Sequence, residues 1–512
     1  MTDDGKQFGV MTSTIWQTPP SQRQRKLRAG RGTPSRGAVS RGVGAGRPEL
    51  ESPRKLTFRA LAFVLLHVPL AVVMQKYTAV ATAHALVSWI GGIMLAASGA
   101  RPATVICTAG YIAGAEVLWR AAQARVFYEG GKYAICAVLL SSMFRLRLLQ
   151  INKGALLYFV LLIPSAFVTL KGNDFQFARE LLSFNLSGPF ALAVCITYFG
   201  QVRVAPRELV DLLWTMLGPL LGLASICSIA TFGTDDVSFE STESNFQTSA
   251  GAGPNQVSSV LGWGVVCAFL WVNLTKRSFL ATLVSVGMML FFAMQAALTF
   301  SRSGVWMAML GLMLASAFLV RNARALLVTG GLTLLVALLA WFLVLPFLDS
   351  YTGGQVSNRF AEEGFSNRDS IAKEDLLLFL ENPVLGVGPG MGKYARAARF
   401  GSGGAAHTEF TRLFSEHGVF GVLALLVLLG VSSSKFVPRA PSHVKAVRYT
   451  ALFYSFLFMC VTAMRVALPA FVLGLGFLGW AQVRGPGRQT LSPGRGRPGG
   501  PPLTRAGASP PT

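Results

Sequence analysis

Apolar residues form long runs along most of the chain, and polar residues gather between the runs and at both ends. The runs recur from Phe58 to Val483 at about 17–25 residues, the length of an α-helix that crosses a bilayer. This pattern predicts an all-α polytopic membrane protein with about 12–14 transmembrane helices. The fourteen predicted segments are 58–75, 78–98, 102–119, 131–149, 154–171, 184–202, 208–232, 254–274, 278–299, 304–320, 325–348, 418–434, 446–464 and 466–482.

Polar segments divide these helices into regions. The two ends are rich in Gly, Pro, Ser and Arg and have no apolar periodicity, so we expect disordered basic tails. One internal polar segment is longer than ordinary connections, which favours a functional loop. The predicted regions are a tail at 1–57, a helix bundle at 58–348, a loop at 349–417, C-terminal helices at 418–483 and a tail at 484–512.

Charges between the runs predict which side of the membrane each loop faces, because short cytoplasmic loops collect Lys and Arg. Basic residues fall in alternate loops, whereas residues 233–253 contain acidic residues and no Lys or Arg. This asymmetry predicts that both termini are cytoplasmic and that the loop 349–417 is extracytoplasmic. The informative residues are Arg145, Arg147, Lys153, Lys435, Arg439, Lys445 and Arg448 inside, and Asp235, Asp236, Glu240 and Glu243 outside.

Composition agrees with a membrane protein, since 52% of residues are hydrophobic and 13% are charged, against about 25% charged in soluble domains. The net charge of +23 lies largely in the two tails, where it suits topology and anionic lipid rather than nucleic acid. Specific binding by "RQRKLRAGRG" is the alternative for the first tail.

All six cysteines lie in apolar runs without metal-ligand spacing, so we expect them to be core residues.

The segment "NPVLGVGPGMGK" invites comparison with a nucleotide-binding loop. It fails the P-loop pattern, because Val387 stands where the first glycine belongs and Tyr394 where Ser or Thr belongs. Gly386, Gly388 and Gly390 instead predict a tight turn with positive φ angles. The turn is either structural or a place where backbone N–H groups approach a phosphate or sugar.

The same loop ends with a histidine followed by a helical pattern, "HTEFTRLFSEHGVFG". Spacing places His407, Phe410 and His417 on one face of an amphipathic surface helix that ends near Gly418. A single histidine is either structural or catalytic. Arginines on the same side of the membrane favour a functional site. Arg302 begins a span in "LTFSRSGVW", where either interfacial snorkelling or an anionic partner would explain it.

Arg359 and Arg368 lie in the loop itself, where a surface salt bridge is the alternative to a functional role.

Three patches together resemble the O-antigen ligase/polymerase superfamily. They are "SRSG" at a span start, "NRDSIAKEDLLLFLENPVLGVGPG" and "HTEFTRLFSEHGVFG". The last is similar to the ligase signature of His, an amide or Ser, nine residues, Gly, two residues and Gly; Thr408 departs from it, whereas Gly418 and Gly421 fit. The resemblance covers about residues 250–435.

The resemblance implies a GT-C-like membrane glycosyltransferase with one large extracytoplasmic loop. Such an enzyme transfers a glycan from undecaprenyl diphosphate to a glycan or lipid A-core acceptor at the outer face of the inner membrane, without metal or cofactor. His407 would be the general base, and Arg302 and Arg368 would stabilise the diphosphate. Arg359 and the three glycines would contact substrate. Other polysaccharide-assembly proteins are further candidate partners.

Two basic residues in the predicted helices are weaker candidates. Arg120 ends a span that contains Glu116, and Lys132 follows in "RVFYEGGKY". Each would contact the donor diphosphate or, alternatively, take part in a helix-packing ion pair. The "GPNQ" stretch from Gly253 predicts a helix start, which could also bind an anion.

Polymerase and ligase share these features, and Thr408 slightly favours a polymerase of O-antigen or exopolysaccharide. A lipid-linked glycan flippase or other transporter is the alternative of another class, and a scaffold subunit is a third. Because the distinctive polar residues gather in one outer loop rather than along a transmembrane path, the sequence favours the enzyme.

Overall fold

The computed structural model describes residues 53–233, 237–240, 243–275, 278–320, 323–361, 368–436 and 440–481. The predicted tails fall outside these residues, except that the first helix already begins at Pro53, five residues before the predicted boundary. Proline suits the first turn of a helix, where its missing N–H has no intrahelical partner. Asp235, Asp236 and Arg439, which entered the charge argument, also lie outside the described residues.

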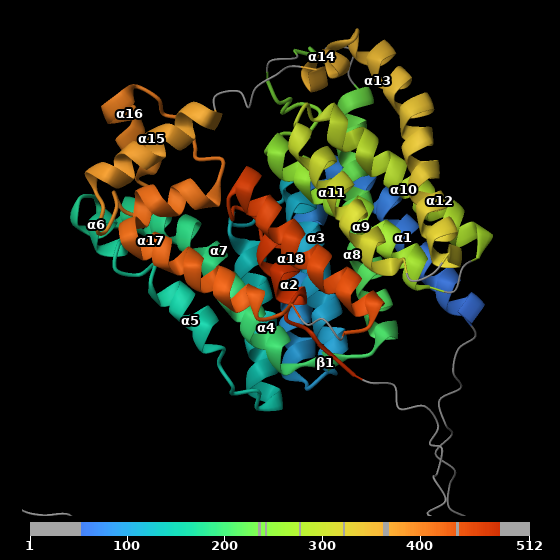
Figure 1. Cartoon of the computed structure of the whole chain (residues 1–512), viewed down its shortest axis with the longest axis horizontal. Helices are drawn as coiled ribbons and strands as arrows, with labels where there is room; N and C mark the ends of the chain where they lie inside the picture. Colours follow the sequence, from blue (N-terminus) through green and yellow to red (C-terminus); the bar gives the residue numbers. More distant parts are fainter. Residues whose placement is uncertain are drawn as a thin grey trace, which may run out of the picture. The chain divides into compact units, whose positions relative to one another are not determined.

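Helices dominate the described residues, and the chain is an all-α polytopic membrane protein (Figure 1). The two short strands pair in parallel, with Arg203 opposite Gly479. The elements are α1 (Pro53–Lys76), α2 (Thr78–Ala97), α3 (Pro102–Ala121), α4 (Gly130–Leu146), α5 (Lys153–Val160), α6 (Ala166–Lys171), α7 (Phe175–Gln201), β1 (Arg203–Val204), α8 (Pro206–Phe232), α9 (Pro254–Leu274), α10 (Phe279–Leu298), α11 (Arg302–Leu319), α12 (Ala323–Leu339), the π-helical η1 (Ala340–Val344), α13 (Leu345–Thr352), α14 (Gln355–Ala361), α15 (Arg368–Glu381), α16 (Gly392–Phe400), α17 (Glu409–Ser433), α18 (Ser442–Thr462), α19 (Leu468–Leu475) and β2 (Gly479–Trp480).

Ten helices in the described part of the chain are long and apolar enough to cross a bilayer. They are α1, α2, α7, α8, α9, α10, α11, the continuous stretch Ala323–Thr352, α17 and α18. The predicted segments 102–119 and 131–149 also form single helices, α3 with 20 residues and α4 with 17. Twelve of the fourteen predicted segments therefore correspond to one long helix each.

The other two predicted spans are wrong as continuous helices. Segment 154–171 breaks into α5 and α6 around Pro164, because proline lacks the N–H that a helix interior needs and disfavours helical geometry in the preceding residue. Segment 466–482 contains only the eight residues of α19 and then the strand β2. Glycines at 474, 476 and 479 weaken helix continuation there.

Burial separates central helices from peripheral ones. In α9, 89% of the span window is buried, and in α8, 78%; for Ala323–Thr352 the figure is 17%. Helix α8 packs against α1, α3 and α9, and α9 packs against α10 and α11. An apolar helix with so little burial must face lipid, whereas α8 and α9 form the core that the other helices surround.

The predicted loop 349–417 is largely helical and lies at one end of the bundle (Figure 1). Helices α13 to α16 gather at this end, and β1 lies at the opposite end. Helix α15 packs against α16 and α17, so the segment is a folded part of the protein. That this end faces away from the cytoplasm stays a prediction.

Five of the six cysteines fit the prediction of core residues, at least in part. Cys136, Cys195, Cys227 and Cys267 are buried, and Cys107 is half-buried. The prediction is wrong for Cys460, which is exposed on α18.

Candidate active site

Arg302 is the first residue of α11, as the "SRSG" pattern predicts. The helix can begin here because Gly304 has no side chain: a Cβ atom would lie 2.0 Å from the carbonyl oxygen of Ser258 in α9. The Ser258 hydroxyl accepts a hydrogen bond from the Gly304 N–H at 3.1 Å and donates one to the Ser301 carbonyl at 2.8 Å. Helix α9, the most buried span, therefore fixes the position of Arg302.

Arg359 holds the turn that precedes Arg302. Phe300 in this turn is fully buried and has a φ of 56°, which is rare for a residue with a side chain. The Arg359 Nε donates to the Phe300 carbonyl at 3.1 Å, and the Arg302 Nη1 donates to the Arg359 carbonyl at 3.4 Å. Arg359 is 5% exposed. The structure therefore places Arg359 inside the protein, and its contact with substrate stays a prediction.

Arg368 begins α15 and reaches across to the N-terminus of α9. Its Nη2 donates to Asn255 Oδ1 at 2.8 Å, and the same oxygen accepts from the Ser301 hydroxyl at 2.6 Å. Asn255 belongs to "GPNQ", which does start a helix, with Pro254 as its first residue. Burial lowers the pKa of Arg368, and repulsion from Arg359 and Arg302 lowers it further. The three guanidinium groups are therefore close enough to repel one another.

His407 lies in the extended segment before α17, and the prediction that it shares a helix face with His417 is wrong. The reason is Thr408, whose hydroxyl accepts a hydrogen bond from the Phe410 N–H at 3.1 Å and caps the helix. The cap leaves His407 one residue outside the helix.

His417 is also no surface residue. It is completely buried, and its Nδ1 is hydrogen-bonded to the Ser165 hydroxyl. The segment 409–417 is therefore not an amphipathic surface helix.

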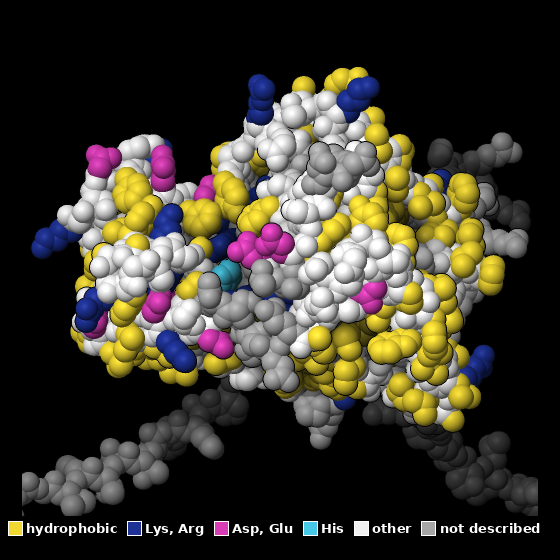
Figure 2. All heavy atoms as spheres, turned by 90° about the horizontal axis from the view of Figure 1, so that it is seen from above, with side chains coloured by type: hydrophobic (Ala, Val, Ile, Leu, Met, Phe, Trp, Pro, Cys, Tyr) yellow, Lys and Arg dark blue, Asp and Glu magenta, His cyan; other side chains and the backbone are white. Residues whose placement is uncertain are grey.

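One cavity of about 660 Å³ is lined by Arg302, Arg359, Arg368 and His407 together. We name it the large cavity. Figure 2 views this end of the bundle, where some Lys and Arg side chains (dark blue) are visible near the centre beside His (cyan) and Asp or Glu (magenta), others stand at the edge, and hydrophobic side chains (yellow) cover much of the periphery. The structure thus brings together four predicted site residues that are spread over more than 100 positions of the sequence, from Arg302 to His407.

Half of the large cavity is apolar. Trp306, Met307 and Leu310 of α11 line one side, and Leu457 and Val461 of α18 line the other. Trp306 is 52% exposed and Leu310 is 38% exposed, so this half opens on the surface that faces lipid. The cavity therefore joins a cationic region at the end of the bundle to an apolar region along the membrane.

The surroundings of His407 keep its imidazole neutral. Burial and the nearby positive charges of Arg368, Arg465 and Arg396 lower its pKa to about 4. Neither ring nitrogen makes a hydrogen bond to any described residue, and a neutral imidazole can accept a proton.

No three His, Cys, Asp or Glu side chains among the described residues are grouped as metal ligands would be. Metal independence stays a prediction.

The glycine turn has the predicted backbone, but it does not reach the large cavity. Gly386, Gly388 and Gly390 have φ angles of 66°, 95° and 82°. The Val387 and Gly388 N–H groups donate to the carbonyls of Ser415 and Glu416 at 2.9 and 3.1 Å. These donors are already used, which favours the structural interpretation of the turn.

The glycine turn packs on a kink in α17 at Gly418. This residue has φ 59° and ψ −140°, as the predicted helix end requires, and the chain resumes its helix beyond it. The Val419 N–H donates to the Pro383 carbonyl at 2.7 Å. Residues 382–390 therefore pack across the kink and are hydrogen-bonded to α17 on both sides of Gly418.

Arg120 and Lys132 do not line the large cavity. Arg120 forms an ion pair with Glu116 at 2.6 Å and lies over the Tyr128 ring at 3.7 Å. This is the helix-packing ion pair that the sequence left open. Lys132 is completely buried, and its Nζ has no hydrogen-bond partner. We find no role for it in the large cavity.

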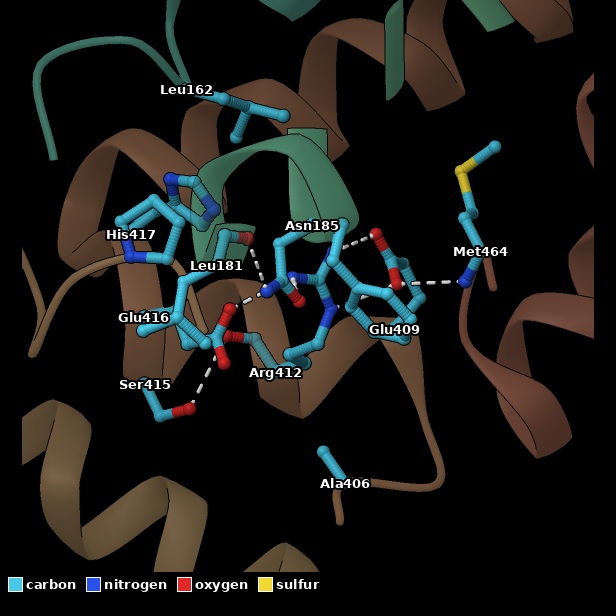
Figure 3. Close-up of polar contacts among 12 residues, drawn as sticks. Leu162, Leu181, Asn185, Ala406, Glu409, Arg412, Ser415, Glu416, His417 and Met464 are labelled. Atoms are coloured by element: carbon cyan, nitrogen blue, oxygen red, sulfur yellow. Dashed lines mark hydrogen bonds and ion pairs between the residues drawn. The ribbon is translucent and has the colours of Figure 1, made fainter. Parts of the chain in front are cut away.

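A buried ionic network next to His407 was not predicted. In Figure 3, Arg412 lies between Glu409 and Glu416, with Asn185 of α7 beside it. Its hydrogen bonds to Glu409 are 2.5 and 3.0 Å, and those to Glu416 and Asn185 are 2.8 and 3.1 Å. The i,i+3 and i,i+4 spacings were visible in the sequence, but such pairs usually lie on exposed helix faces.

Two further anchors hold the segment that carries His407. Arg396 of α16 forms a buried ion pair with Asp375 of α15 and donates to the Gly404 carbonyl at 2.5 Å. Arg465, between α18 and α19, donates to the Ala406 carbonyl at 2.7 Å. Neither residue carries a sequence signal that separates it from other basic residues. The segment is therefore fixed on both sides of Ala405.

Comparison with known proteins identifies this region. Residues 287–426 match the family model described as O-Antigen ligase. No curated protein sequence matches the chain. The match runs from within α10 to within α17, and so it contains Arg302, Arg359, Arg368 and His407. This match supports the resemblance of the region to the O-antigen ligase/polymerase superfamily.

Proposed function

We propose that this glycan-processing membrane enzyme transfers a glycan from undecaprenyl diphosphate to a sugar hydroxyl at the periplasmic face of the bacterial inner membrane. The product would be a surface polysaccharide, either O-antigen or exopolysaccharide. The observation that carries the proposal is the convergence of Arg302, Arg359, Arg368 and His407 on one cavity.

The arginines suit a diphosphate leaving group. Guanidinium groups match phosphate oxygens in pairs and stay charged in proteins. Arg302 and Arg368 approach from two different helices, and each is held by contacts to neighbouring backbone or side-chain oxygens. Charges fixed in place before the reaction stabilise the charge that develops as the sugar–phosphate bond breaks.

The apolar half of the large cavity suits a polyprenyl chain. A lipid-linked donor needs its diphosphate among cations while its isoprenoid chain stays in the hydrocarbon region. Trp306 and Leu310 are exposed on the lipid-facing side of the cavity and supply such a surface. A water-soluble nucleotide sugar would have no use for this opening.

His407 would act as the general base. Its neutral ring accepts the proton of the acceptor hydroxyl while that oxygen bonds to the anomeric carbon of the donor glycan. The bond from this carbon to the diphosphate breaks at the same time, and its electron pair leaves on the diphosphate. The lipid diphosphate then carries the negative charge that Arg302 and Arg368 stabilise.

We propose a polymerase in preference to a ligase, because Thr408 departs from the ligase signature. The test incubates purified protein with lipid-linked repeat units, with and without a lipid A-core acceptor. A ladder of lengthening lipid-linked glycans is expected. Transfer to core alone would identify a ligase, and transbilayer movement without new glycosidic bonds would identify a transporter.

The catalytic assignment is tested by His407→Ala. Turnover should fall by roughly 10²–10⁴-fold, the usual contribution of a positioned proton acceptor. His443→Ala is the matched control, because His443 lies at the start of α18 and lines neither half of the large cavity. Equal activity of the two variants at equal membrane abundance would refute the role of His407.

A further inference from the structure

A second cavity lies on the other side of the segment that carries His407. Its volume is about 180 Å³, and Ala405 and Ala406 line it, whereas His407 and Thr408 line the large cavity. We name it the small cavity. Two of these four consecutive residues line one cavity and the next two line the other. His407 therefore lies at the boundary between the two cavities.

The loop between α18 and α19 places Arg465 in the wall of the small cavity. This loop begins at Ala463, which has a φ of 45°, an uncommon value for a residue with a side chain. Glu409 Oε2 accepts from the Met464 N–H at 3.1 Å (Figure 3), and Arg120 donates to the Arg465 carbonyl at 3.3 Å. Strained backbone held by charged side chains is typical of functional sites.

Glu116 holds the far end of the same loop, since its Oε2 accepts from the Ala467 N–H at 2.5 Å. The ion pair of Glu116 with Arg120 therefore holds the loop between α18 and α19 in addition to its role in helix packing. Together with Glu409 it fixes both ends of the loop and so fixes Arg465. The Arg465 side chain then reaches the Ala406 carbonyl, beside His407.

The charges around the small cavity do not balance. Arg412 is paired with Glu409 and Glu416, and Arg396 is paired with Asp375. Arg465 and Lys393 also line the cavity, and no described carboxylate forms an ion pair with either of them. Burial lowers the pKa of Arg465, and the nearby carboxylates of Glu409 and Glu416 offset this effect only in part.

We propose that the small cavity binds the acceptor sugar and that this sugar carries an anionic group, a carboxylate or a phosphate ester, held by Arg465 and Lys393. The inference rests on the proposed function and names the acceptor class for the same site. The diphosphate of the donor has its own arginines in the large cavity, so the cations of the small cavity serve a different anion. Phe184 provides an aromatic wall, and pockets for small ligands commonly combine such a wall with a few polar groups.

The experiment measures binding rather than turnover. Full-length protein in lipid nanodiscs is titrated with glucose, glucuronic acid and glucose 6-phosphate, and binding is followed by saturation-transfer NMR. At least one anionic sugar should bind more tightly than glucose, and which one does so distinguishes a carboxylate from a phosphate. In Arg465→Gln its affinity should fall about ten- to a hundredfold, the factor for a lost charge-assisted hydrogen bond.

Two further variants protect the test from folding defects. Lys393→Gln alters an exposed residue at the cavity and should also weaken binding of the anionic sugar. Arg399→Gln is the control, because Arg399 lies on the same helix but is 63% exposed and paired with Glu381. It should bind like the unmodified protein.

Arg302→Gln separates this inference from the proposed function, since it should abolish transfer and leave binding of the anionic sugar unchanged. Equal affinity for glucose and both anionic sugars would overturn the inference. So would a preference that survives Arg465→Gln and Lys393→Gln, or one that disappears in Arg302→Gln. Selective binding without any glycan transfer by the unmodified protein would leave this site standing and refute the proposed function.

Discussion

Lowering the pH from 7.5 to 5.5 should hardly change kcat/KM of the purified enzyme. An ordinary histidine with a pKa of 6.5 would lose about nine-tenths of its base form over this range, and a tenfold loss of rate would follow. Because burial and three arginines lower the pKa of His407 to about 4, about 97% of the side chain stays neutral at pH 5.5. The acid limb of the pH profile, where kcat/KM falls as His407 becomes protonated, should therefore lie below pH 5.

The sign of the effect can be tested separately with Arg368→Gln. Arg368 is the first of the charges that lower the His407 pKa, so its removal should move the acid limb of kcat/KM to higher pH. The rate of this variant will be low at every pH. The pH at which kcat/KM begins to fall does not depend on that absolute rate. In kcat, which reports the complex, the bound diphosphate should raise the limb even in the unmodified enzyme.

The assay uses initial rates with lipid-linked repeat units at pH 3.5 to 8.0, at constant ionic strength. Thermal unfolding at each pH excludes loss of protein as the cause of any change. A limb of kcat/KM near pH 6.5 in the unmodified enzyme would refute the proposed electrostatics of His407. A limb that stays in place in Arg368→Gln would do the same.

Three other predictions follow from geometry. Arg302→Lys should lose at least about tenfold in turnover, because lysine cannot hold two phosphate oxygens in a planar fork. Gly418→Ala should lower the thermal stability of the solubilised protein, because its φ is 59° and a Cβ atom would lie 2.5 Å from the Val384 carbonyl oxygen. In a cysteine-free background, an impermeant thiol reagent added to spheroplasts should label a cysteine at Gln355 and leave one at His443 unlabelled.

Each of these predictions has a control and a contradicting outcome. Arg399→Lys should keep normal turnover, and Arg302→Lys with equal turnover would leave Arg302 as an interfacial anchor. Gly430→Ala, in the same helix as Gly418, meets no atom within 4 Å and should not destabilise the protein. Equal stability of both glycine variants would contradict the strain argument. Labelling at His443 instead of Gln355 would invert the topology and exclude the periplasmic reaction.

The fold was predictable to the extent that helix length and apolarity decide it. Most spans follow from apolar runs, because a bilayer leaves few alternatives to a helix. The two errors lie where local chemistry opposed the run, at Pro164 and in the glycines after Leu473. Both signals were present in the sequence, because proline and glycine disfavour a helix even within an apolar run.

The site was only partly predictable. The start of α11 at Arg302 follows from the position of the apolar run, and the role proposed for His407 came from the family resemblance. Thr408 is a preferred N-cap residue and could have placed His407 outside the helix. The burial of Arg412 and the position of Arg465 depend on tertiary packing of α17 against α7 and the loop after α18, which a single sequence does not reveal.

The opening of the large cavity between α11 and α18 has a consequence for turnover. In the proposed reaction the spent lipid carrier keeps its diphosphate, so its attraction to Arg302 and Arg368 would not end with the transfer. Product that leaves must slide sideways past Trp306 and Leu457 into the bilayer. We therefore expect carrier release to limit the rate, as product release does in many enzymes.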